Sequence, residues 1–592
     1  MRFISTFTLE TILKMKINFK LPSLFLCLVL MSSAVQAQYK QTITNKTQLL
    51  YNKNKTIPFG RLDELKIAVA VPAKEKYSAF IEQIERYADI SVIDLNQLNE
   101  QGKLSNTIIV AATSSDLAIT NAALLNQAVS NNKNVIVCKF LDSDFSKVQS
   151  TSQFGGKVTE LIYPEFSAEA QRNLGMSVFG GLGITEGSTK FKTQQTRLQY
   201  SKGEGSGLNL AKMTQKIDAI AAEAIREEAT PGLVVMAIKN GQVIFEKSYG
   251  HHTYEAKQKT SINDIFDLAS VSKIAGTTPV VMHLQETNAI NLDSTMGKYL
   301  WDVKSTNKKD IKLRSVLLHE AGFTPYIPFY RNLKPGDVQR FPSATHQVQL
   351  ADSSYLRNNY YEEIMWPEMM KSAVKPVGNY VYSDISMYVM KEVAEHITSQ
   401  PMEEYVQELL YRPIGMKTAG YNPRKRFDKS RIVPTEHDTS FRKVLLEGFV
   451  HDQGAAMAGG VAGHAGLFAS ANDLAIYGQL LLNRGEYGGS RYFKANTVDL
   501  FTSTQSKTSR RGLGFDRFDP NPKNEYPSKL ANPSVFGHTG YTGTCIWIDP
   551  KHQLVYIFLS NRVHPQVSTK LLNLNIRSRI QDAIYETINE AK

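Results

Sequence analysis

The sequence predicts an α/β domain followed by an α+β domain, and three observations support this. Residues 64–190 alternate short apolar runs with helical patterns, as in a parallel sheet covered by helices. A Gly/Ser-rich run at 201–207 then indicates a linker. Beyond it, a hairpin signal stands near each end of the remaining sequence, with helical patterns between them. With 592 residues, the chain also exceeds one ordinary core.

Within the α/β domain, assigned to residues 38–200, short apolar runs are expected to form buried strands. Gly180–Gly183 follows a helical pattern and lacks the Lys-Ser/Thr of a phosphate-binding loop, so we expect a turn there. The expected strands are Lys66–Val71, Ile90–Leu95, Thr107–Ala112 and Asn134–Phe140, and the expected helices are Tyr77–Asp89 and Asp116–Ser130.

Within residues 208–592, a helix and a hairpin at the start are mirrored by a hairpin and a helix at the end. Asn240-Gly241 is a strong hairpin turn signal. The pattern favours an antiparallel sheet covered by helices from both ends of this region, with a helical subdomain inserted. The expected elements are helix Met213–Glu228, strands Leu233–Ile238, Gln242–Tyr249, Gly543–Ile548 and Gln553–Ser560, and helix Leu571–Asn589.

The N-terminus has the form of a signal peptide, assigned to residues 1–37. Lys16 and Lys20 precede an apolar run, Leu24–Met31, and Val35–Ala37 has the small-x-small form of a cleavage site. The run is too short to span a bilayer comfortably. We therefore expect a periplasmic or secreted protein without a stable membrane span after cleavage, whether translation starts at Met1 or at Met15.

Composition narrows the function classes. Hydrophobic residues make up 42% and charged residues 21%, as in globular proteins. The net charge is +12, but there is no Lys/Arg block and no nucleic-acid motif, so no nucleic-acid partner is expected. Cys138 and Cys545 fall in different predicted domains, which does not favour a disulfide framework. No H-x-x-x-H pattern occurs, so neither a metal nor a cofactor is expected.

Ser270 and Lys273 form an S-x-x-K pattern that stands out by its setting. The same pattern starts at Ser130, Ser305, Ser372 and Ser440 by chance, but Ser270 opens an apolar run that predicts a buried helix, with a possible kink at Pro279. Positions i and i+3 share one helix face, so Lys273 can reach the Ser270 hydroxyl. Burial would lower the pKa of Lys273 and let it accept a proton.

Two further motifs, Tyr382-Ser383-Asp384 and His538-Thr539-Gly540, follow in the chain. With Ser270–Lys273, in this order and spacing, they resemble the serine β-lactamase and penicillin-binding-protein superfamily. The similar branch contains class C β-lactamases, D-alanyl-D-alanine carboxypeptidases, D-aminopeptidases and family VIII esterases. Flanking sequence extends the resemblance from about Leu208 to near the C-terminus. It implies an α+β serine β-lactamase-like domain.

The resemblance implies a role for each motif residue. Ser270 is the nucleophile, and Lys273 and Tyr382 act as one coupled base. The backbone N–H groups of Ser270 and Tyr541 form the oxyanion hole. The residues expected to contact substrate are Asp384, His538, Thr539, Gly540 and Tyr541.

Two departures from the β-lactamase pattern bear on the substrate. Asp384 stands where asparagine is common, and a carboxylate cannot donate to a substrate amide. It either pairs with Lys273 or lies behind the substrate contacts. His538 replaces a lysine and brings less positive charge. We therefore expect cleavage of a carboxylic ester or a D-amino-acid amide, with β-lactamase activity weak at best. His464, in a loop shared with the family, is expected to serve a structural turn.

Residues 38–200 are similar to the end of the C-terminal α/β domain of family 3 glycoside hydrolases. The similar features are the lead-in Leu49–Phe59, the first strand and Ala168–Gly183. In that family a catalytic barrel precedes this domain, but here only about 50 residues precede the first strand, too few for a barrel. We expect this domain to be structural or to bind a ligand.

The leading hypothesis is an exported serine hydrolase that forms an acyl-enzyme on Ser270, with peptidoglycan fragments among the candidate substrates. Two alternatives stay open: a non-catalytic binding protein of the same fold, and a glycan-binding or glycoside-hydrolase-associated protein. The aromatic-rich stretch Phe323–Trp366 is either a locally packed excursion or a wall that selects substrate.

Overall fold

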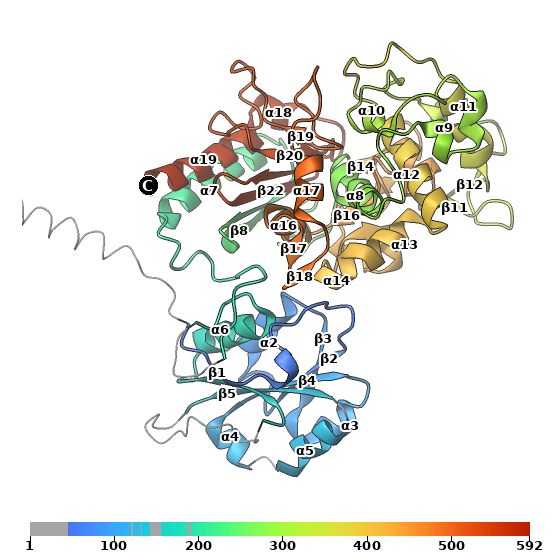
Figure 1. The fold of residues 1–592 in the computed structure, drawn as a ribbon. Coiled ribbons are helices and arrows are strands. Elements are labelled where there is room, and N and C mark those ends of the chain that lie inside the picture. Colours follow the sequence, from blue (N-terminus) through green and yellow to red (C-terminus); the bar gives the residue numbers. More distant parts are fainter. Residues whose placement is uncertain (1–44, 120–121, 132, 143–155, 186–190, 592) are drawn as a thin grey trace, which may run out of the picture. The chain divides into compact units, whose positions relative to one another are not determined.

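The computed structural model describes residues 45–119, 122–131, 133–142, 156–185 and 191–591. The predicted signal peptide, residues 1–37, lies outside them. The first sheet has the strand order β1-β6-β5-β4-β2-β3 (Figure 1). All its neighbouring strands are parallel except β1 and β6, which are antiparallel. The strands are β1 Gln48–Tyr51, β2 Ile67–Val71, β3 Ile90–Asp94, β4 Thr107–Thr113, β5 Asn134–Phe140 and β6 Thr159–Tyr163.

Helices cover both faces of this sheet, as the alternating pattern predicted. Val69 packs in a core with α2 (Ser78–Glu85) and α6 (Ala168–Phe179). Ala68 points to the opposite face and packs in the core that includes α3 (Leu98–Gln101) and α5 (Ala122–Ser130). The helix expected over Asp116–Ser130 is divided into α4 (Ser114–Ile119) and α5.

The second sheet is antiparallel throughout, with the order β19-β20-β21-β22-β7-β8. Asn240 and Gly241, both with positive φ, form the predicted turn between β7 and β8. The strands are β7 Gly232–Lys239, β8 Gln242–Gly250, β19 Asp516–Arg517, β20 Phe536–Thr539, β21 Cys545–Asp549 and β22 Leu554–Ser560.

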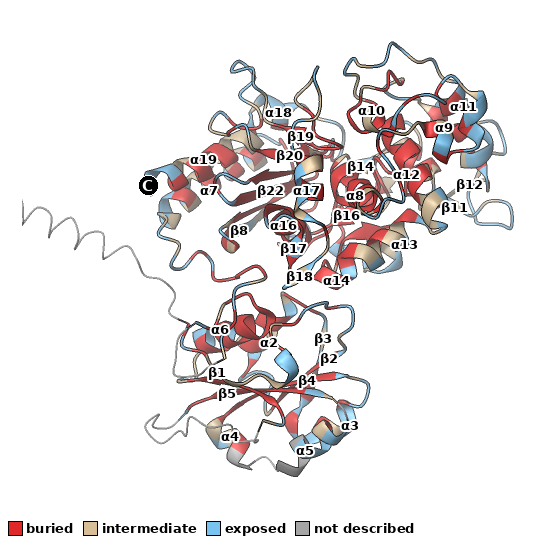
Figure 2. Ribbon diagram, in the orientation of Figure 1, coloured by how far each residue is buried: buried red, intermediate tan, exposed pale blue. Residues whose placement is uncertain are grey.

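Helices from both ends of this region pack on one face of the second sheet. They are α7 (Leu210–Arg226) and α19 (Ile576–Glu590), which share a buried core with β21 and β22. Figure 2 shows their buried faces turned toward the sheet. α16 (Ala471–Leu482) covers the opposite face. The expected helix over Leu571–Asn589 is interrupted, because Asn575 adopts a left-handed φ of 51° and separates the short α18 (Lys570–Asn573) from α19.

A mainly helical region lies between β8 and β19 in the chain. A π-helical turn, η5 (Lys273–Thr277), leads into α8 (Thr278–Glu286). Pro279 stands in the first turn of α8, where its missing N–H costs no helical hydrogen bond. The strand β9 (Phe266–Asp267), which precedes η5, forms a small sheet with β16 (Leu467–Ala469) and β13 (Gly420–Tyr421). The helix α12 (Ile385–Thr398) packs against η5 and α8.

The aromatic-rich stretch contains more regular structure than its composition suggested. It forms a three-stranded sheet, a π-helical turn η8 (Tyr361–Met365) and the start of α11 (Trp366–Lys371). Phe329 and Tyr360 are buried, whereas Tyr326 is 42% exposed, so packed and exposed aromatic residues alternate. The three strands are β10 Val338–Gln339, β11 Val348–Ala351 and β12 Ser354–Leu356.

Among the described residues, those in the ranges 45–203 and 208–591 belong to one compact unit by their internal contacts. The boundary predicted at 201–207 stays a prediction.

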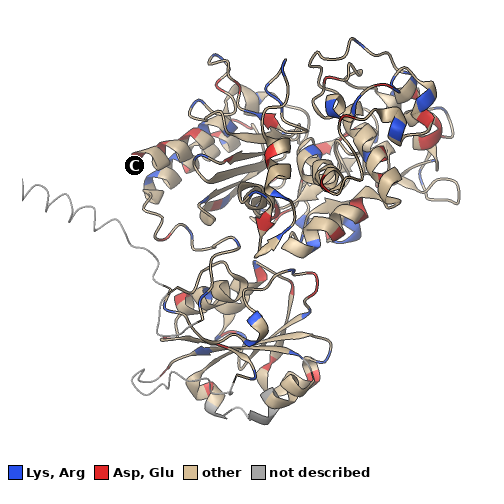
Figure 3. Cartoon of the chain, in the orientation of Figure 1, with Lys and Arg blue, Asp and Glu red and all other residues tan. Residues whose placement is uncertain are grey.

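Basic and acidic residues are interspersed along the described chain (Figure 3). None of the described helices combines the length and apolar character that crossing a membrane requires.

Candidate active site

A tightly held turn between β9 and η5 carries Ser270. Leu268 N donates to Leu467 O at 3.0 Å, and the Asp267 carboxylate accepts from Ala269 N at 2.8 Å. Ala269 has a φ of 46°, a left-handed conformation that costs a non-glycine residue about 1 kcal/mol. Strain of this kind persists only where the surroundings enforce it. The backbone therefore holds Ser270, which is partly exposed, in one position at the start of η5.

The Ser270 hydroxyl lies between an amine and a phenol. Lys273 Nζ is 3.0 Å from Ser270 Oγ, and the Tyr382 hydroxyl is 3.0 Å from the same oxygen. Lys273 is brought there by the one-turn spacing, while Tyr382 reaches it from the segment that precedes α12. A hydroxyl in this position can lose its proton as its oxygen attacks an electrophile.

The pKa of Lys273 does not follow the expectation that burial would lower it. The side chain is fully buried, and burial does act in that direction. However, Lys273 Nζ is 2.9 Å from Asp384 Oδ1, and the attraction of Asp384, together with Tyr382, outweighs burial. The pKa of Lys273 is therefore raised, and the expectation that burial would lower it is wrong. Asp384 was expected either to pair with Lys273 or to lie behind the substrate contacts, and the structure shows the pair with Lys273.

Hydrogen bonds from neighbouring loops fix the Tyr382–Asp384 segment. Ser383 Oγ donates to Thr324 O at 2.6 Å, and Asp384 N donates to Pro325 O at 3.0 Å. Ser383 N donates to His319 Nδ1 at 3.2 Å. These bonds to Ser383 and Asp384 hold the segment, so Tyr382 and Asp384 keep their places relative to Lys273.

Tyr382 is surrounded by other polar rings and cations. Lys273 Nζ lies 4.9 Å and Arg511 Cζ 5.4 Å from the centre of its ring. The His319 ring is 4.6 Å away. Burial, with the nearby Arg511 and Lys273, holds the pKa of His319 well below its usual value, so this ring is neutral. Tyr382 therefore lies between a neutral ring and two cations that face its aromatic ring.

His538 is buried, neutral and backed by an arginine. Its Nδ1 is 2.7 Å from Thr539 O, and its Nε2 is 3.2 Å from Arg511 Nη1. An arginine can only donate, so Nε2 accepts and Nδ1 carries the proton. Burial and the charge of Arg511 lower the pKa of His538 to about 3. The expectation that His538 brings little charge therefore agrees with its surroundings, but Arg511 supplies a permanent cation directly behind it.

The buried Arg511 is held by groups on two sides. Its Nη2 donates to the Tyr380 hydroxyl at 3.1 Å, and its Nε is 3.9 Å from Asp516 Oδ1. Burial opposes the charge, but Asp516 and the neighbouring tyrosines raise the pKa of Arg511 above its ordinary value. Sequence reasoning missed this residue.

The turn after β20 packs on the segment that carries the serine. Gly540 N donates to Thr544 O at 2.8 Å, and Thr544 Oγ1 donates to Leu268 O at 3.0 Å. A Cβ on Gly540 would collide with Leu268 O, so only glycine permits this approach. The strand β19 pairs with β20 only at Phe536 and Gly537. The Tyr541 side chain is 51% exposed.

His464 has more contacts than the structural turn expected of it. Its carbonyl accepts from Lys273 Nζ at 3.3 Å, and its Nε2 is 3.0 Å from Asp452 Oδ1. Ligand atoms of Asp384, Asp452 and His464 all lie within 4.8 Å of one another. Two carboxylates and a histidine can bind a cation. Here, however, the Asp384 carboxylate already pairs with Lys273, and the Asp452 carboxylate pairs with His464. This cluster carries no metal assignment.

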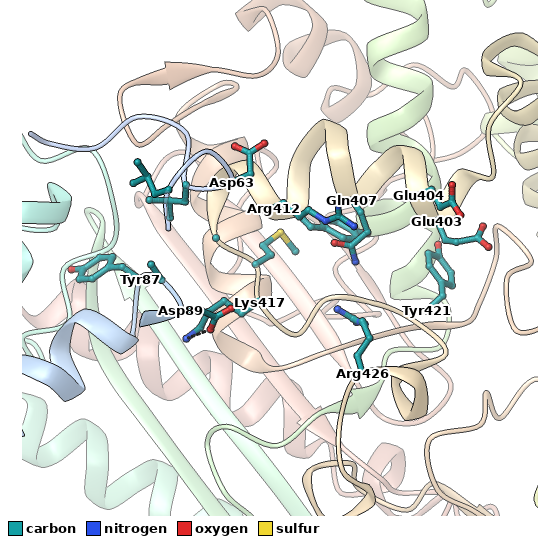
Figure 4. Close-up of a pocket in the computed structure, with 16 residues that line it drawn as sticks. Asp63, Tyr87, Asp89, Glu403, Glu404, Gln407, Arg412, Lys417, Tyr421 and Arg426 are labelled. Atoms are coloured by element: carbon teal, nitrogen blue, oxygen red, sulfur yellow. Dashed lines mark ion pairs between the residues drawn. The ribbon is translucent and has the colours of Figure 1, made fainter. Parts of the chain in front are cut away.

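Figure 4 draws a cavity of about 480 Å³ elsewhere in the molecule. Acidic and basic side chains both line it, among them Asp63, Glu403, Arg412 and Arg426. The described residues that line it include none of the site residues predicted from the sequence, so its size gives no reason to place the chemistry there.

The structure thus brings the three motifs together. Ser270, Lys273, Tyr382 and Asp384 form one hydrogen-bonded cluster. His538, Thr539 and Gly540 border it on the β20 side, since the His538 ring is 6.2 Å from the Tyr382 ring and Gly540 packs against Leu268. Arg511 and Asp452 were not predicted, because neither belongs to a short motif.

Comparison with known proteins gives a concordant result. A family model described as Beta-lactamase matches residues 217–580. A "Putative D-alanyl-D-alanine carboxypeptidase" of Escherichia coli (strain K12) is 28% identical over 403 residues, which cover 64% of this chain and 89% of that protein. A protein of the same description from Salmonella typhimurium (strain LT2) is 28% identical over 371 residues, covering 58% and 82%.

Solved structures with lower identity are also similar. "EstCE1, a hydrolase with promiscuous acyltransferase activity" has a TM-score of 0.49 and 19% identity, and the match covers 64% of this chain and 99% of that one. A "Novel Penicillin-Binding Protein (PBP) Homolog from Caulobacter crescentus" has a TM-score of 0.46 and 14% identity, covering 63% and 97%.

Proposed function

We propose that this chain, which belongs to the β-lactamase family, is an exported serine hydrolase that forms an acyl-enzyme on Ser270. One observation carries the proposal: Ser270 Oγ lies 3.0 Å from both Lys273 Nζ and the Tyr382 hydroxyl. A serine hydroxyl held between a buried amine and a phenol that can exchange its proton suits nucleophilic catalysis. Export rests on the leader-like residues 1–37 alone.

In this proposal Tyr382 takes the proton of Ser270, and Lys273 stays charged. The ion pair with Asp384 raises the pKa of Lys273, so the ammonium is a poor acceptor at neutral pH. Its charge and that of Arg511 lie 4.9 and 5.4 Å from the centre of the Tyr382 ring. The Tyr382 oxygen is within hydrogen-bond distance of Ser270 Oγ and can return the proton to the leaving group.

The oxyanion hole is assigned to the backbone N–H groups of Ser270 and Tyr541. Two observations support this choice. The strained turn at Ala269 fixes the first N–H, and Gly540 lets the turn after β20 approach the same segment. Donors held in advance lower the barrier because they need no reorganisation when charge develops.

We assign the substrate to esters or D-amino-acid amides that end in a carboxylate. Arg511, through its position behind His538, supplies the positive charge that a histidine alone lacks. This charge attracts a carboxylate next to the bond that Ser270 attacks. The curated relatives' description as carboxypeptidases agrees with such a substrate. Asp384 is held by Lys273 and is acceptor-only, which favours slow turnover of β-lactams.

Intact-mass spectrometry tests the proposal. The full chain is incubated with a fluorophosphonate, a penicillin and a D-alanyl-D-alanine peptide, and the modified residue is mapped. A stoichiometric adduct on Ser270 supports the acyl-enzyme. A chain that shows no adduct with any probe, while remaining folded, would be a binding protein of this fold.

We further propose that residues 38–200 form a non-catalytic domain similar to the end of a family 3 glycoside hydrolase. Buried apolar residues occupy both faces of its sheet, as a structural or ligand-binding layer requires. Release of nitrophenol from aryl glycosides, retained when Ser270 is replaced by alanine, would contradict this.

A further inference from the structure

A pocket rich in positive charge shares Arg511 with the surroundings of Tyr382. Its volume is about 610 Å³, and its lining includes Tyr380 and four cationic side chains. One of the four, Arg511, also donates to His538 and lies 5.4 Å from the Tyr382 ring. Arg511 therefore belongs both to the proposed active site and to this basic pocket. The four cationic residues that define it are Lys507, Arg510, Arg511 and Arg517.

Acidic partners neutralise only part of this charge. Arg510 binds Asp516 through two nitrogens, at 2.7 and 3.1 Å, and Asp519 through a third at 3.0 Å. Asp519 is the single acidic residue in the lining as described. Within the part of the chain that the structure describes, neither Lys507 nor Arg517 takes part in an ion pair. The pocket therefore keeps a net positive charge.

Arg517 and Lys507, the two cations without carboxylate partners, differ in how exposed they are. Arg517 is buried, and its guanidinium donates to Thr502 O and to Pro533 O, the latter at 2.7 Å. Lys507 is exposed and free to move toward a ligand. The pocket thus combines one fixed cation with one adaptable cation, which suits a small anion at its mouth.

The loop that supplies Lys507 is preformed. Thr508 Oγ1 donates to Glu320 Oε1 and to Gly378 O, both at 3.0 Å. At the other end of the loop, Gln505 N donates to Arg511 O at 3.0 Å. A loop tied at both ends loses little conformational freedom when a ligand binds.

We propose that the basic pocket is a subsite for a second anionic group of the substrate, beyond the carboxylate assigned to Arg511 and His538. The ligand chemistry is a carboxylate or a phosphate carried on the leaving group. This inference rests on the proposed function, because it places the pocket along the path of the same substrate. It predicts a higher kcat/KM for esters with a dianionic leaving group than for esters with a monoanionic one.

A series of phenylacetyl esters tests the subsite on the full chain. The leaving groups are phenol, 3-hydroxybenzoate, 5-hydroxyisophthalate and an analogue with phosphate in place of the second carboxylate. We expect kcat/KM to rise at each added charge, and the phosphate analogue tells which anion is preferred. The added advantage of the second charge should fall as salt screens it.

Variants of Lys507 separate the subsite from the catalytic centre. Lys507→Gln should lower kcat/KM for the dianionic ester about three- to fivefold, as for loss of one exposed ion pair, with little change for the phenyl ester. Lys507→Glu should lower it further, and Lys507→Arg should retain it. Lys257→Gln removes an equally exposed charge outside the pocket and should have no effect. A second charge that gives no advantage, or an advantage indifferent to Lys507→Glu, would refute the subsite.

A binding measurement tells failure of the subsite from failure of the proposed function. In the Ser270→Ala chain, which cannot acylate, equilibrium binding of 5-hydroxyisophthalate is compared with that of 3-hydroxybenzoate. Tighter binding of the dianion, lost with Lys507→Glu, supports the pocket even where no ester is cleaved. Equal binding contradicts the pocket even where the phenyl ester is cleaved at Ser270.

Discussion

Two buried cations, Lys273 and Arg511, lie near the Tyr382 ring, and they differ in how they are neutralised. Lys273, on η5, is fully buried and has its own carboxylate, Asp384, at 2.9 Å. Arg511, in the loop before β19, has Asp516 at 3.9 Å. Asp516 is shared, because Arg510 binds both of its oxygens. Lys273 is neutralised by its own carboxylate within the site, whereas Arg511 is only partly neutralised and can still attract an anionic ligand.

This difference divides the work of the site between proton transfer and recognition. A cation with its own carboxylate keeps its proton and fixes the charge state of its neighbours. A cation whose carboxylate is distant still attracts an anion, and burial strengthens that attraction by excluding water. We therefore expect changes near Lys273 to alter catalytic rates, and changes near Arg511 to alter the choice of substrate.

The largest effect is expected where both sides meet, at Ser270. Ser270→Ala should lower ester turnover by roughly three or more orders of magnitude, because no other group replaces the attacking oxygen. Turnover and adduct mass are measured together. Ser440→Ala, which alters another S-x-x-K pattern, is the matched control and should behave as the unmodified chain. An adduct on Ser372 or Ser440 would show that the assignment of the nucleophile is wrong.

Changes on the Lys273 side should come next. Tyr382→Phe should lower kcat by roughly 10² to 10⁴, the range for loss of a proton-transfer group, and Lys273→Ala by a similar factor because Tyr382 loses the adjacent ammonium. The double variant should lose little beyond the worse single one, since Lys273 acts through Tyr382. Pre-steady-state acylation rates of the four chains measure this. Cleanly additive losses would mean that the residues act separately.

Changes on the Arg511 side should affect recognition. Arg511→Gln removes a charge-assisted contact, so kcat/KM for carboxylate-terminated substrates should fall about 10- to 100-fold. Neutral p-nitrophenyl esters should fall much less. Because Arg511 is buried, urea unfolding of each variant is measured alongside, and Arg511→Lys, which keeps the charge, should recover part of the loss. An equal fall for neutral and anionic esters would assign Arg511 to folding alone.

The sequence was informative where contacts are local or repeated. The i,i+3 spacing placed Lys273 beside Ser270, and Asn240-Gly241 placed the hairpin turn of β7 and β8. The alternation of strands and helices predicted the parallel part of the first sheet. Strands β1 and β6 were missed, since β1 joins antiparallel and only long-range pairing creates it.

The sequence was least informative where a charge depends on distant partners. Arg511 precedes His538 by 27 positions and belongs to no short motif, so only the pairing of β19 with β20 brings them together. The pKa of Lys273 was misjudged for a related reason. Burial can be inferred from an apolar run, but the 2.9 Å ion pair with Asp384 bridges 111 positions and reverses its effect.

The smallest change in maximal rate is expected for Asp384→Asn, which should instead shift the pH dependence of the rate in a defined direction. Asp384 raises the pKa of Lys273, and burial acts in the opposite direction. Without the carboxylate charge burial prevails, so Lys273 loses its proton at a lower pH. If Lys273 works as an ammonium, the alkaline limb of the kcat/KM profile must move to lower pH while the plateau changes little. If a neutral Lys273 were instead the base, the same variant would extend activity on the acidic side. The profile of a p-nitrophenyl ester from pH 5 to 10 decides between them, because the two limbs move independently.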